Sequence, residues 1–386
     1  MKRLGAIWTG FFACLFAVQT ASAANVMKPV ALSVEGKLVG AAFSPDSSRL
    51  AIIGNVAGPG TSGQRHVLQI VELKSGQEVA HADVLDTEPA GLATSAHFIE
   101  YSSDGRYLLL ATKGSDVLSI VDTTTLRTLK RIALHPAEDS RMSLGQGNRY
   151  FRGVVSLAGS ARGDVFGVLT HDELQGNEVF VGSFSSGQVI RSWGLGKGRT
   201  ATQLGQTSVS LNEDGSRIVV SVLPDENSLP KGFNNLRLYS ASSGDMVKSI
   251  RTDGLVGQVM LLPSGNILAA RIDTPGLFSK KACIEDWSFS TGNLGNRFCD
   301  RGRNVSVALA VSLTANRVVG FASQMHKSIE GQVYAASGRV DLWDMKSGKI
   351  IASSDEIPRL VSHLQISPNG EWVMADQTLF QTSTTP

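Results

Sequence analysis

One region of the 386-residue chain carries side chains that could hold an anion, a sugar or an acidic protein surface. The residues concerned are cationic or aromatic, and they fall in two neighbouring polar stretches: Arg141, Arg149, Tyr150, Phe151, Arg152, Lys197 and Arg199. Guanidinium groups bind oxyanions through paired hydrogen bonds, and aromatic rings offer amphipathic contact surface. We therefore predict a binding site from these residues. The alternative is a solvated loop whose aromatic side chains pack against the scaffold.

Two of the seven histidines could bind a metal or act as a general base. His97 and His363 each stand near the start of an expected innermost strand, so their side chains could meet around a central channel. The alternative is that both are hydrogen-bonded structural residues. None of the histidines lies at the spacing of a ligand pair on a helix.

Other catalytic motifs are missing from the sequence, so no catalytic residue is assigned. There is no Walker loop, no G-x-S-x-G elbow and no H-E-x-x-H. Residues 58–63 match G-x-G-x-x-G, but a strand is expected to follow them where a dinucleotide site needs a helix. Without C-x-x-C-H or a recognisable cofactor pocket, no cofactor is predicted.

Cys283 and Cys299 flank a turn at 290–293 whose two arms have the pattern of hairpin strands. Both cysteines are equally far from Thr291, and residues so placed lie opposite each other in a hairpin, within reach of a disulfide. A free pair or a metal site is the alternative, but no histidine lies within twenty residues. We predict a structural disulfide that closes a 17-residue loop.

The first 23 residues have the pattern of a secretory signal peptide. Lys2 and Arg3 precede an apolar run over 4–18, and small residues up to Ala23 provide a cleavage site. The run is shorter than the ~20 apolar residues of a membrane-spanning helix. We expect cleavage after Ala23 and a mature chain, 24–386, that is periplasmic or secreted and has no transmembrane segment. Such a compartment is oxidising and permits the disulfide.

The composition restricts the possible function classes. Hydrophobic residues make up 42% of the chain, which excludes a disordered protein. The formal net charge is +2, and both surplus charges, Lys2 and Arg3, leave with the signal peptide. A neutral mature chain argues against nucleic-acid binding driven by overall positive charge.

A turn between two apolar strands recurs seven times along the chain. The first is Phe43-Ser-Pro-Asp-Ser47 and the last is Ile366-Ser-Pro-Asn-Gly370. Equivalent positions in the seven turns are spaced by 50 to 58 residues: Asp46, Asp104, Arg162, Asp214, Ser264, Ala315 and Asn369. Proline and aspartate suit the first positions of such turns, and glycine suits the position with positive φ.

Six of the seven units contain a second turn, preceded by a slot that is mostly apolar. The slot lies five residues before the last turn position and is filled in succession by Val71, Val121, Gly182, Tyr239, Trp287 and Trp343. Two hairpins per unit give four strands in about 52 residues, which is close to the size of a propeller blade.

At these residues the chain resembles the WD-repeat and YVTN-type β-propellers. Trp343-Asp344 reproduces the WD dipeptide, and the segment 116–126 is similar to a YVTN repeat. The resemblance, together with the repeat, implies an all-β fold, a seven-bladed β-propeller of four-stranded antiparallel blades in a single domain. The last unit ends one strand short, and 26–34 is a strand without a unit. We expect this N-terminal strand to complete the last blade and close the ring. An open β-sandwich array is the alternative.

In such a propeller the tight turns share one face and the longer connections share the other. The longer connections are expected at 54–66, 84–96, 133–153, 193–206, 223–235, 273–282 and 323–338. Because long loops on a rigid scaffold commonly carry binding sites, we predict a non-enzymatic, monomeric binding scaffold. Its expected partner is a protein or a small anionic or glycan ligand of the cell envelope. The alternative is a propeller enzyme, a lactonase-like hydrolase or a dehydrogenase, with its site at the channel mouth.

Overall fold

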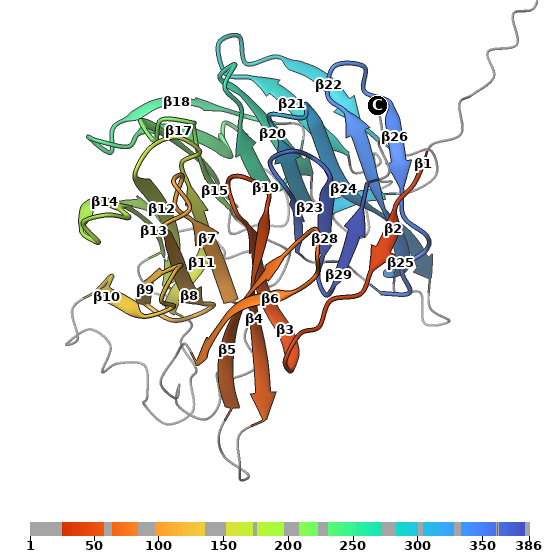
Figure 1. Ribbon diagram of the computed structural model, residues 1–386. Helices are drawn as coiled ribbons and strands as arrows, with labels where there is room; N and C mark the ends of the chain where they lie inside the picture. The colour runs from red at the N-terminus through yellow and green to blue at the C-terminus, as the bar shows by residue number, and fades with distance from the viewer. Residues whose placement is uncertain are drawn as a thin grey trace, which may run out of the picture.

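The described residues form seven β-sheets that are arranged in a ring (Figure 1). The computed structural model describes residues 25–57, 64–83, 97–135, 152–172, 176–196, 208–222, 231–252, 254–271, 283–299, 304–327, 333–359, 361 and 363–382. Over these residues every regular element is a strand, and no helix is present that could cross a membrane. The predicted all-β, seven-bladed propeller with four-stranded antiparallel blades is confirmed.

Each blade uses four strands, innermost first. Blade 1 contains β3 (Lys37–Phe43), β4 (Arg49–Ala57), β5 (Gln64–Glu72) and β6 (Glu78–Asp83). Blade 2 contains β7 (His97–Tyr101), β8 (Tyr107–Thr112), β9 (Val117–Asp122) and β10 (Thr128–Ala133). Blade 3 contains β11 (Arg152–Gly159), β12 (Val165–Asp172), β13 (Gly176–Ser183) and β14 (Val189–Gly196). Blade 4 contains β15 (Val209–Leu211), β16 (Arg217–Ser221), β17 (Leu236–Ser240) and β18 (Met246–Ile250).

The remaining blades follow the same order, with additions from the N-terminal segment. Blade 5 contains β19 (Val256–Leu261), β20 (Asn266–Arg271), β21 (Ile284–Ser288) and β22 (Leu294–Phe298). Blade 6 contains β23 (Asn304–Ser312), β24 (Arg317–Lys327), β25 (Val333–Asp344) and β26 (Ile350–Ser353), with β1 (Asn25–Val26) as a fifth strand. Blade 7 contains β27 (Leu364–Ile366), β28 (Trp372–Ala375) and β29 (Thr378–Gln381), with β2 (Lys28–Val30) as its outermost strand.

Each predicted second turn connects the two strands of an outer hairpin, and its last residue has the left-handed backbone conformation. The last turn position has positive φ in all six: Gly76, Leu126, Gly187, Gly244, Gly292 and Gly348. Only glycine adopts this conformation at low cost, which explains its recurrence at a fixed interval. Leu126 is the exception, and its side chain is buried in the core between blades 1 and 2.

Alternation along the strands builds one apolar core between each pair of neighbouring blades. On β4, Leu50 and Ile52 pack toward blade 7, whereas Ala51 and Ile53 pack toward blade 2. Successive side chains of a strand point to opposite faces of the sheet, so both faces of a blade must be apolar. This requirement explains why the repeat consists of continuous apolar runs.

The N-terminal segment closes the ring, as predicted. Strand β2 pairs antiparallel with β29, Pro29 lying opposite Phe380, and completes blade 7. Strand β1 pairs in parallel with β26 of blade 6, an addition that was not predicted. Between these two strands Met27 is fully buried in the core shared by blades 6 and 7.

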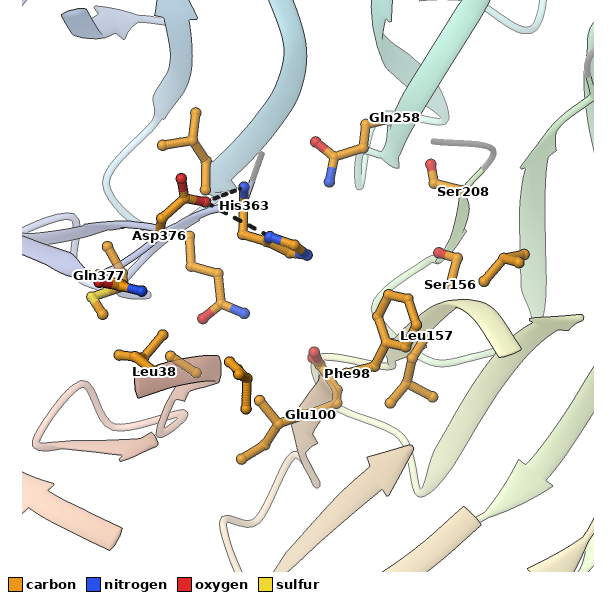
Figure 2. A pocket seen from close by; sticks show the side chains of 18 of the residues that line it. Leu38, Phe98, Glu100, Ser156, Leu157, Ser208, Gln258, His363, Asp376 and Gln377 are labelled. Atoms are coloured by element: carbon orange, nitrogen blue, oxygen red, sulfur yellow. Dashed lines mark hydrogen bonds and ion pairs between the residues drawn. The ribbon is translucent and has the colours of Figure 1, made fainter. Parts of the chain in front are cut away.

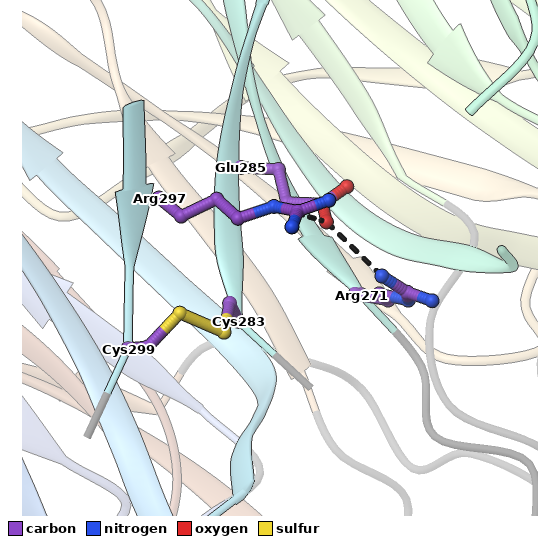
Figure 3. The surroundings of a disulfide bond; sticks show 5 residues. All are labelled: Arg271, Cys283, Glu285, Arg297 and Cys299. Carbon is purple, nitrogen blue, oxygen red and sulfur yellow. Dashed lines mark hydrogen bonds and ion pairs between the residues drawn. A yellow bond between two sulfur atoms is a disulfide. The ribbon is translucent and has the colours of Figure 1, made fainter. Parts of the chain in front are cut away.

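The predicted hairpin and disulfide are both present in blade 5. Cys283 and Cys299 are bonded with their Cα atoms 4.9 Å apart. Ile284 lies opposite Phe298, in the register that a turn centred on Thr291 requires. Figure 3 shows the bond bridging the two outer strands of this blade.

Tight turns such as β3–β4 and β5–β6 share one face of the ring, which we call the tight-turn face. The other connections join strand ends on the opposite face, which we call the long-connection face. Two expected connections are shorter than predicted, because β4 and β5 continue to Ala57 and from Gln64, and β24 and β25 pair as far as Lys327 and Val333. These segments extend the sheets where loops were expected.

Candidate functional site

The predicted basic and aromatic residues are mostly beyond the described part of the chain. Arg141, Arg149, Tyr150, Phe151, Lys197 and Arg199 lie outside the described residues. Arg152 is the first residue of β11, which begins at the long-connection face, and its side chain is also outside the described set. The binding site built on these residues therefore stays a prediction.

The two histidines considered for the channel begin innermost strands or stand just before them. His97 is the first residue of β7, with its side chain outside the described set. His363 directly precedes β27 and lines a cavity at the ring centre. Among the described residues no group of three or more His, Cys, Asp or Glu side chains is arranged to hold a metal ion. The proposed meeting of the two side chains remains a prediction.

A cavity of about 430 Å³ occupies the central channel (Figure 2). Its walls come chiefly from innermost strands: Lys37 to Ala41 of β3, Phe98 to Glu100 of β7, Val155 to Leu157 of β11, Gln258 of β19, and Leu364 and Gln365 of β27. These residues lie mainly in the starting halves of their strands, and every innermost strand starts at the long-connection face. Asp376 and Gln377, which also line the cavity, form the β28–β29 connection on that face. The cavity therefore occupies the channel mouth on the long-connection face.

Part of the cavity wall is tied together by polar side chains that link neighbouring blades. The amide of Val209 donates to the Ser156 hydroxyl (3.1 Å), and the amide of Val259 donates to the Ser208 hydroxyl (2.7 Å). Gln258 accepts through Oε1 from the amide of Leu309 in the same manner. An innermost strand has no strand partner on its channel side, so its outward-facing amides need other acceptors. We call these side chains inter-blade caps.

The caps follow the period of the repeat. Ser156, Ser208 and Gln258 are 52 and 50 residues apart, as are the turn positions Arg162, Asp214 and Ser264. The equivalent residues of the other four blades are Gly40, Phe98, Leu309 and His363. Three of these, Gly40, Phe98 and Leu309, carry no side-chain acceptor. The caps therefore link blade 3 to blade 4, blade 4 to blade 5, and blade 5 to blade 6.

Glu100 is a cap of a second kind, two residues further along the strand. It accepts a hydrogen bond from the Gly159 amide of blade 3, just as Ser210 accepts one from the Leu261 amide of blade 5 (3.0 Å). Burial raises the pKa of the Glu100 carboxyl to about 7, because the charged form loses hydration, and the Gly159 hydrogen bond opposes this rise only in part. A carboxyl group that titrates near neutrality therefore faces the central cavity.

His363 and Asp376 stand together on the blade 7 side of the cavity (Figure 2). Asp376 Oδ1 accepts from the His363 amide at 2.9 Å and lies 3.7 Å from His363 Nδ1. The side chain of His363 is 47% exposed, whereas that of Asp376 is 18% exposed. The carboxylate thus holds the backbone that presents the imidazole, and the imidazole itself is open to the cavity.

A second buried polar cluster lies near the disulfide in blade 5 (Figure 3). Glu285 is 1% exposed and accepts from Arg271 (3.1 Å) and from the indole N–H of Trp287 (3.1 Å), and Arg297 lies 3.3 Å from the same carboxylate. A buried carboxylate with this many partners is satisfied, and its position between β20 and β22 is far from the strand edges of the channel. We assign it a structural role in blade 5.

Glu100 was not predicted to be a channel residue, although the sequence contains a signal for it. Glu100 stands four residues before the turn position Asp104, and Ser210 stands four residues before Asp214. Comparing polar residues at fixed distances from the repeated turn would have indicated both positions. Glu100 stands on the same innermost strand as His97, three residues further along β7.

Fold and cavity together define a seven-bladed β-propeller whose channel opens, on the long-connection face, in a cavity lined by both polar and apolar residues. This architecture is consistent with a WD-repeat or YVTN-type propeller. No protein-family model matches the chain, and no curated protein matches it.

Proposed function

We propose that the protein is an exported binding scaffold that engages its partner on the long-connection face, around the channel mouth. The observation that carries the proposal is the cavity there, which has a mixed polar and apolar lining and a volume of about 430 Å³. Concave sites with an apolar wall and a few directed polar groups are the usual form of ligand sites. The propeller supplies seven rigid blades around that site.

Export is the second part of the proposal. The segment 1–23 has the signal-peptide pattern, and Cys283 and Cys299 are disulfide-bonded, as suits an oxidising compartment. Strand β1 begins at Asn25, two residues after the proposed cleavage site. We propose a periplasmic or secreted monomer.

The proposed contact surface includes the predicted basic and aromatic residues. Strand β11 begins with Arg152 on the long-connection face, and Arg149 and Tyr150 directly precede this strand in the sequence. The partner would be a protein or a small anionic or glycan ligand of the cell envelope. Cationic and aromatic side chains are the residue types that dominate such contacts.

Capture from envelope extracts tests this function. The immobilised protein should retain a specific partner, and a variant with Arg149, Tyr150 and Arg152 changed to alanine should lose most of it. The matched control changes Lys74 and Lys346, two exposed residues on the tight-turn face, and should retain the partner fully. Equal capture by both variants would contradict the proposed face.

An enzyme is the second candidate, and one observation favours it. Glu100 has a pKa of about 7, and His363 with Asp376 lies in the same cavity. A general acid or base is most effective when its pKa is near the working pH. A hydrolase of this kind should lose its turnover in the Glu100→Gln variant, so an unchanged rate in a hydrolysis screen would dismiss this candidate.

A further inference from the structure

We infer that the blade 1 to blade 3 side of the cavity binds a neutral, hydroxyl-rich ligand of the sugar or polyol class. The ligand would lie against the inner edges of β7 and β11, with Glu100 as its anchoring side chain. This inference rests on the proposed function, because it names the ligand class of the same channel mouth.

The first observation is that the inter-blade caps cover only part of the ring. Blades 4, 5 and 6 have an innermost amide capped by Ser156, Ser208 and Gln258. The equivalent amides of blades 2 and 3 belong to Ile99 and Leu157, and the residues that would cap them are Gly40 and Phe98. Neither carries an acceptor, so among the described residues no side chain at the cap position serves these two amides. Both Ile99 and Leu157 line the cavity.

The strand register fixes the direction of these backbone groups. The backbone amide of Ser102 donates to the carbonyl of Tyr107, and the amide of Ser160 donates to the carbonyl of Val165. These two bonds begin the β7–β8 and β11–β12 ladders. In an antiparallel ladder every second residue turns both its N–H and its C=O away from the partner strand. Counting back along each strand, Ile99 and Leu157 are such residues. Each therefore presents one donor and one acceptor toward the channel.

A hydroxyl group matches this arrangement because it donates and accepts at the same time. Glu100 adds a carboxyl between the two strands, which accepts in its charged form and also donates when protonated. Phe98, at the vacant cap position of blade 2, adds an aromatic face to the same wall (Figure 2). An aromatic surface beside paired donors and acceptors suits a ring that has apolar C–H faces and a polar rim.

The charges of the cavity favour a neutral ligand. Lys37 and Arg359 line it together with Glu100 and Asp376, and His363 also contributes to the lining. Cations and acids are equal in number, so neither a carboxylate nor an ammonium ligand would meet a field of one sign. Hydrogen bonding rather than net charge should decide the affinity.

Titration with neutral, acidic and basic sugars tests the inference. The probes are glucose and maltose as neutral ligands, glucuronate as the acid and glucosamine as the base, followed by calorimetry or NMR on the full mature chain. We expect saturable binding of a neutral sugar, and binding of glucuronate and glucosamine that is weaker by about tenfold or more. The Glu100→Ala variant should bind the neutral sugar about tenfold more weakly, whereas Glu100→Gln should stay within about threefold.

A second variant keeps the test valid if Glu100→Ala does not fold. Gly40→Ser places a hydroxyl at the position of blade 1 that corresponds to Ser156 of blade 3. The new hydroxyl could accept from the Ile99 amide of blade 2, as Ser156 accepts from the Val209 amide of blade 4. It should weaken sugar binding by about tenfold, because the Ile99 amide would already have an acceptor. The control is Glu213→Ala on the tight-turn face, where Glu213 pairs with Arg162, and it should bind as the wild type does.

Two results would overturn the inference. One is the absence of saturable binding by either neutral sugar, and the other is equal or tighter binding of glucuronate. If a protein partner is still captured through the long-connection face, the proposed function stands and only the ligand class is wrong.

Discussion

At the scale of the residue, Glu100 does with a carboxyl group what Ser210 does with a hydroxyl. Both accept an amide hydrogen bond from the innermost strand of the next blade. A serine suffices for this bond, and it brings no charge into the ring. The acid in blade 2 therefore introduces a titratable link between blades 2 and 3 at the wall of the cavity. Its protonation state should affect stability.

The Glu100→Gln variant should be more stable than the wild type at pH 8 and equally stable at pH 4.5. The folded-state pKa is raised from 4.5 to about 7, so the fold favours the neutral carboxyl. The wild-type contribution is complete below the unfolded-state pKa and is lost as the pH rises through about 7. Glutamine keeps the acceptor for Gly159 without the charge, and the gain at pH 8 should reach at most about 3 kcal/mol. Urea unfolding between pH 4.5 and 8 measures this difference, and a gap that is constant with pH would contradict the assignment.

At the scale of the element, the repeat predicts strands and turns well. It does not predict where a large side chain on one strand fills the space left by a small residue on the neighbouring strand. The seven first turns and the six second turns were predictable because they depend on local chemistry, such as a glycine that must adopt positive φ. The pairing of a small and a large residue in blade 3 was not predictable in this way. Gly182 stands in a slot that holds Val71 or Trp343 elsewhere, and the ring of Phe166 from the opposite strand position fills the space, since a Cβ on Gly182 would lie 2.2 Å from Phe166 Cζ.

Gly182→Val should therefore destabilise blade 3, although valine suits a strand. The new side chain overlaps the buried Phe166 ring, and overpacking of this kind costs about 1–3 kcal/mol or more. Phe166→Ala in the same chain should recover part of the loss, so the double variant should be more stable than the sum of the single effects predicts. Gly194→Val is the control, because a Cβ at Gly194 meets nothing within 4 Å. Thermal unfolding of the four variants would test this. Additive effects of Gly182→Val and Phe166→Ala would contradict the claim that Phe166 fills the space at Gly182.

The hairpin of blade 5 should depend on its disulfide. Cys283 and Cys299 are 16 residues apart, and a cross-link of this span restricts the unfolded chain by roughly 3 kcal/mol. We expect reduction to lower the unfolding free energy by about this amount. A Cys283→Ala, Cys299→Ala chain should resemble the reduced protein and ignore the reductant. Identical denaturation curves of the oxidised and reduced wild type would show that the bond contributes nothing.

At the scale of the whole molecule, the number of blades follows from the sequence and the cavity does not. Seven turn positions at a near-constant interval predict seven units. The last unit has only three strands of its own, which predicts closure by the N-terminal segment. The channel wall depends on which residues the closed ring brings together. Ser156 and Val209 are neighbours only because blades 3 and 4 are adjacent at a set angle, and single-sequence patterns do not give that angle. The parallel pairing of β1 escaped prediction because two residues carry no strand period.

Closure should be a property that can be removed and restored. A chain that begins at Leu32 lacks β1, β2 and Met27, so it exposes the edge of β29 and opens the core between blades 6 and 7. Burial of a methionine alone stabilises by about 1.5–3 kcal/mol, and the lost strand pairing adds to this. We expect the melting temperature to fall by on the order of 10 °C and unfolding to become less cooperative in calorimetry. The exposed edge should also promote association, visible in size-exclusion chromatography.

Two comparisons make the closure test specific. A chain that begins at Met27 keeps β2 and the buried methionine but lacks β1, and it should unfold close to the chain that begins at Asn25. A synthetic peptide of residues 24–31, added to the chain that begins at Leu32, should restore much of the lost melting temperature, because it can pair with β29 and β26 as the intact segment does. Restoration should rise with peptide concentration, as linkage between binding and folding requires. The chain that begins at Leu32 could instead melt with the same midpoint and cooperativity as the chain that begins at Asn25. In that case the N-terminal strands are not needed to close the ring, and blades 1 and 7 close it without them.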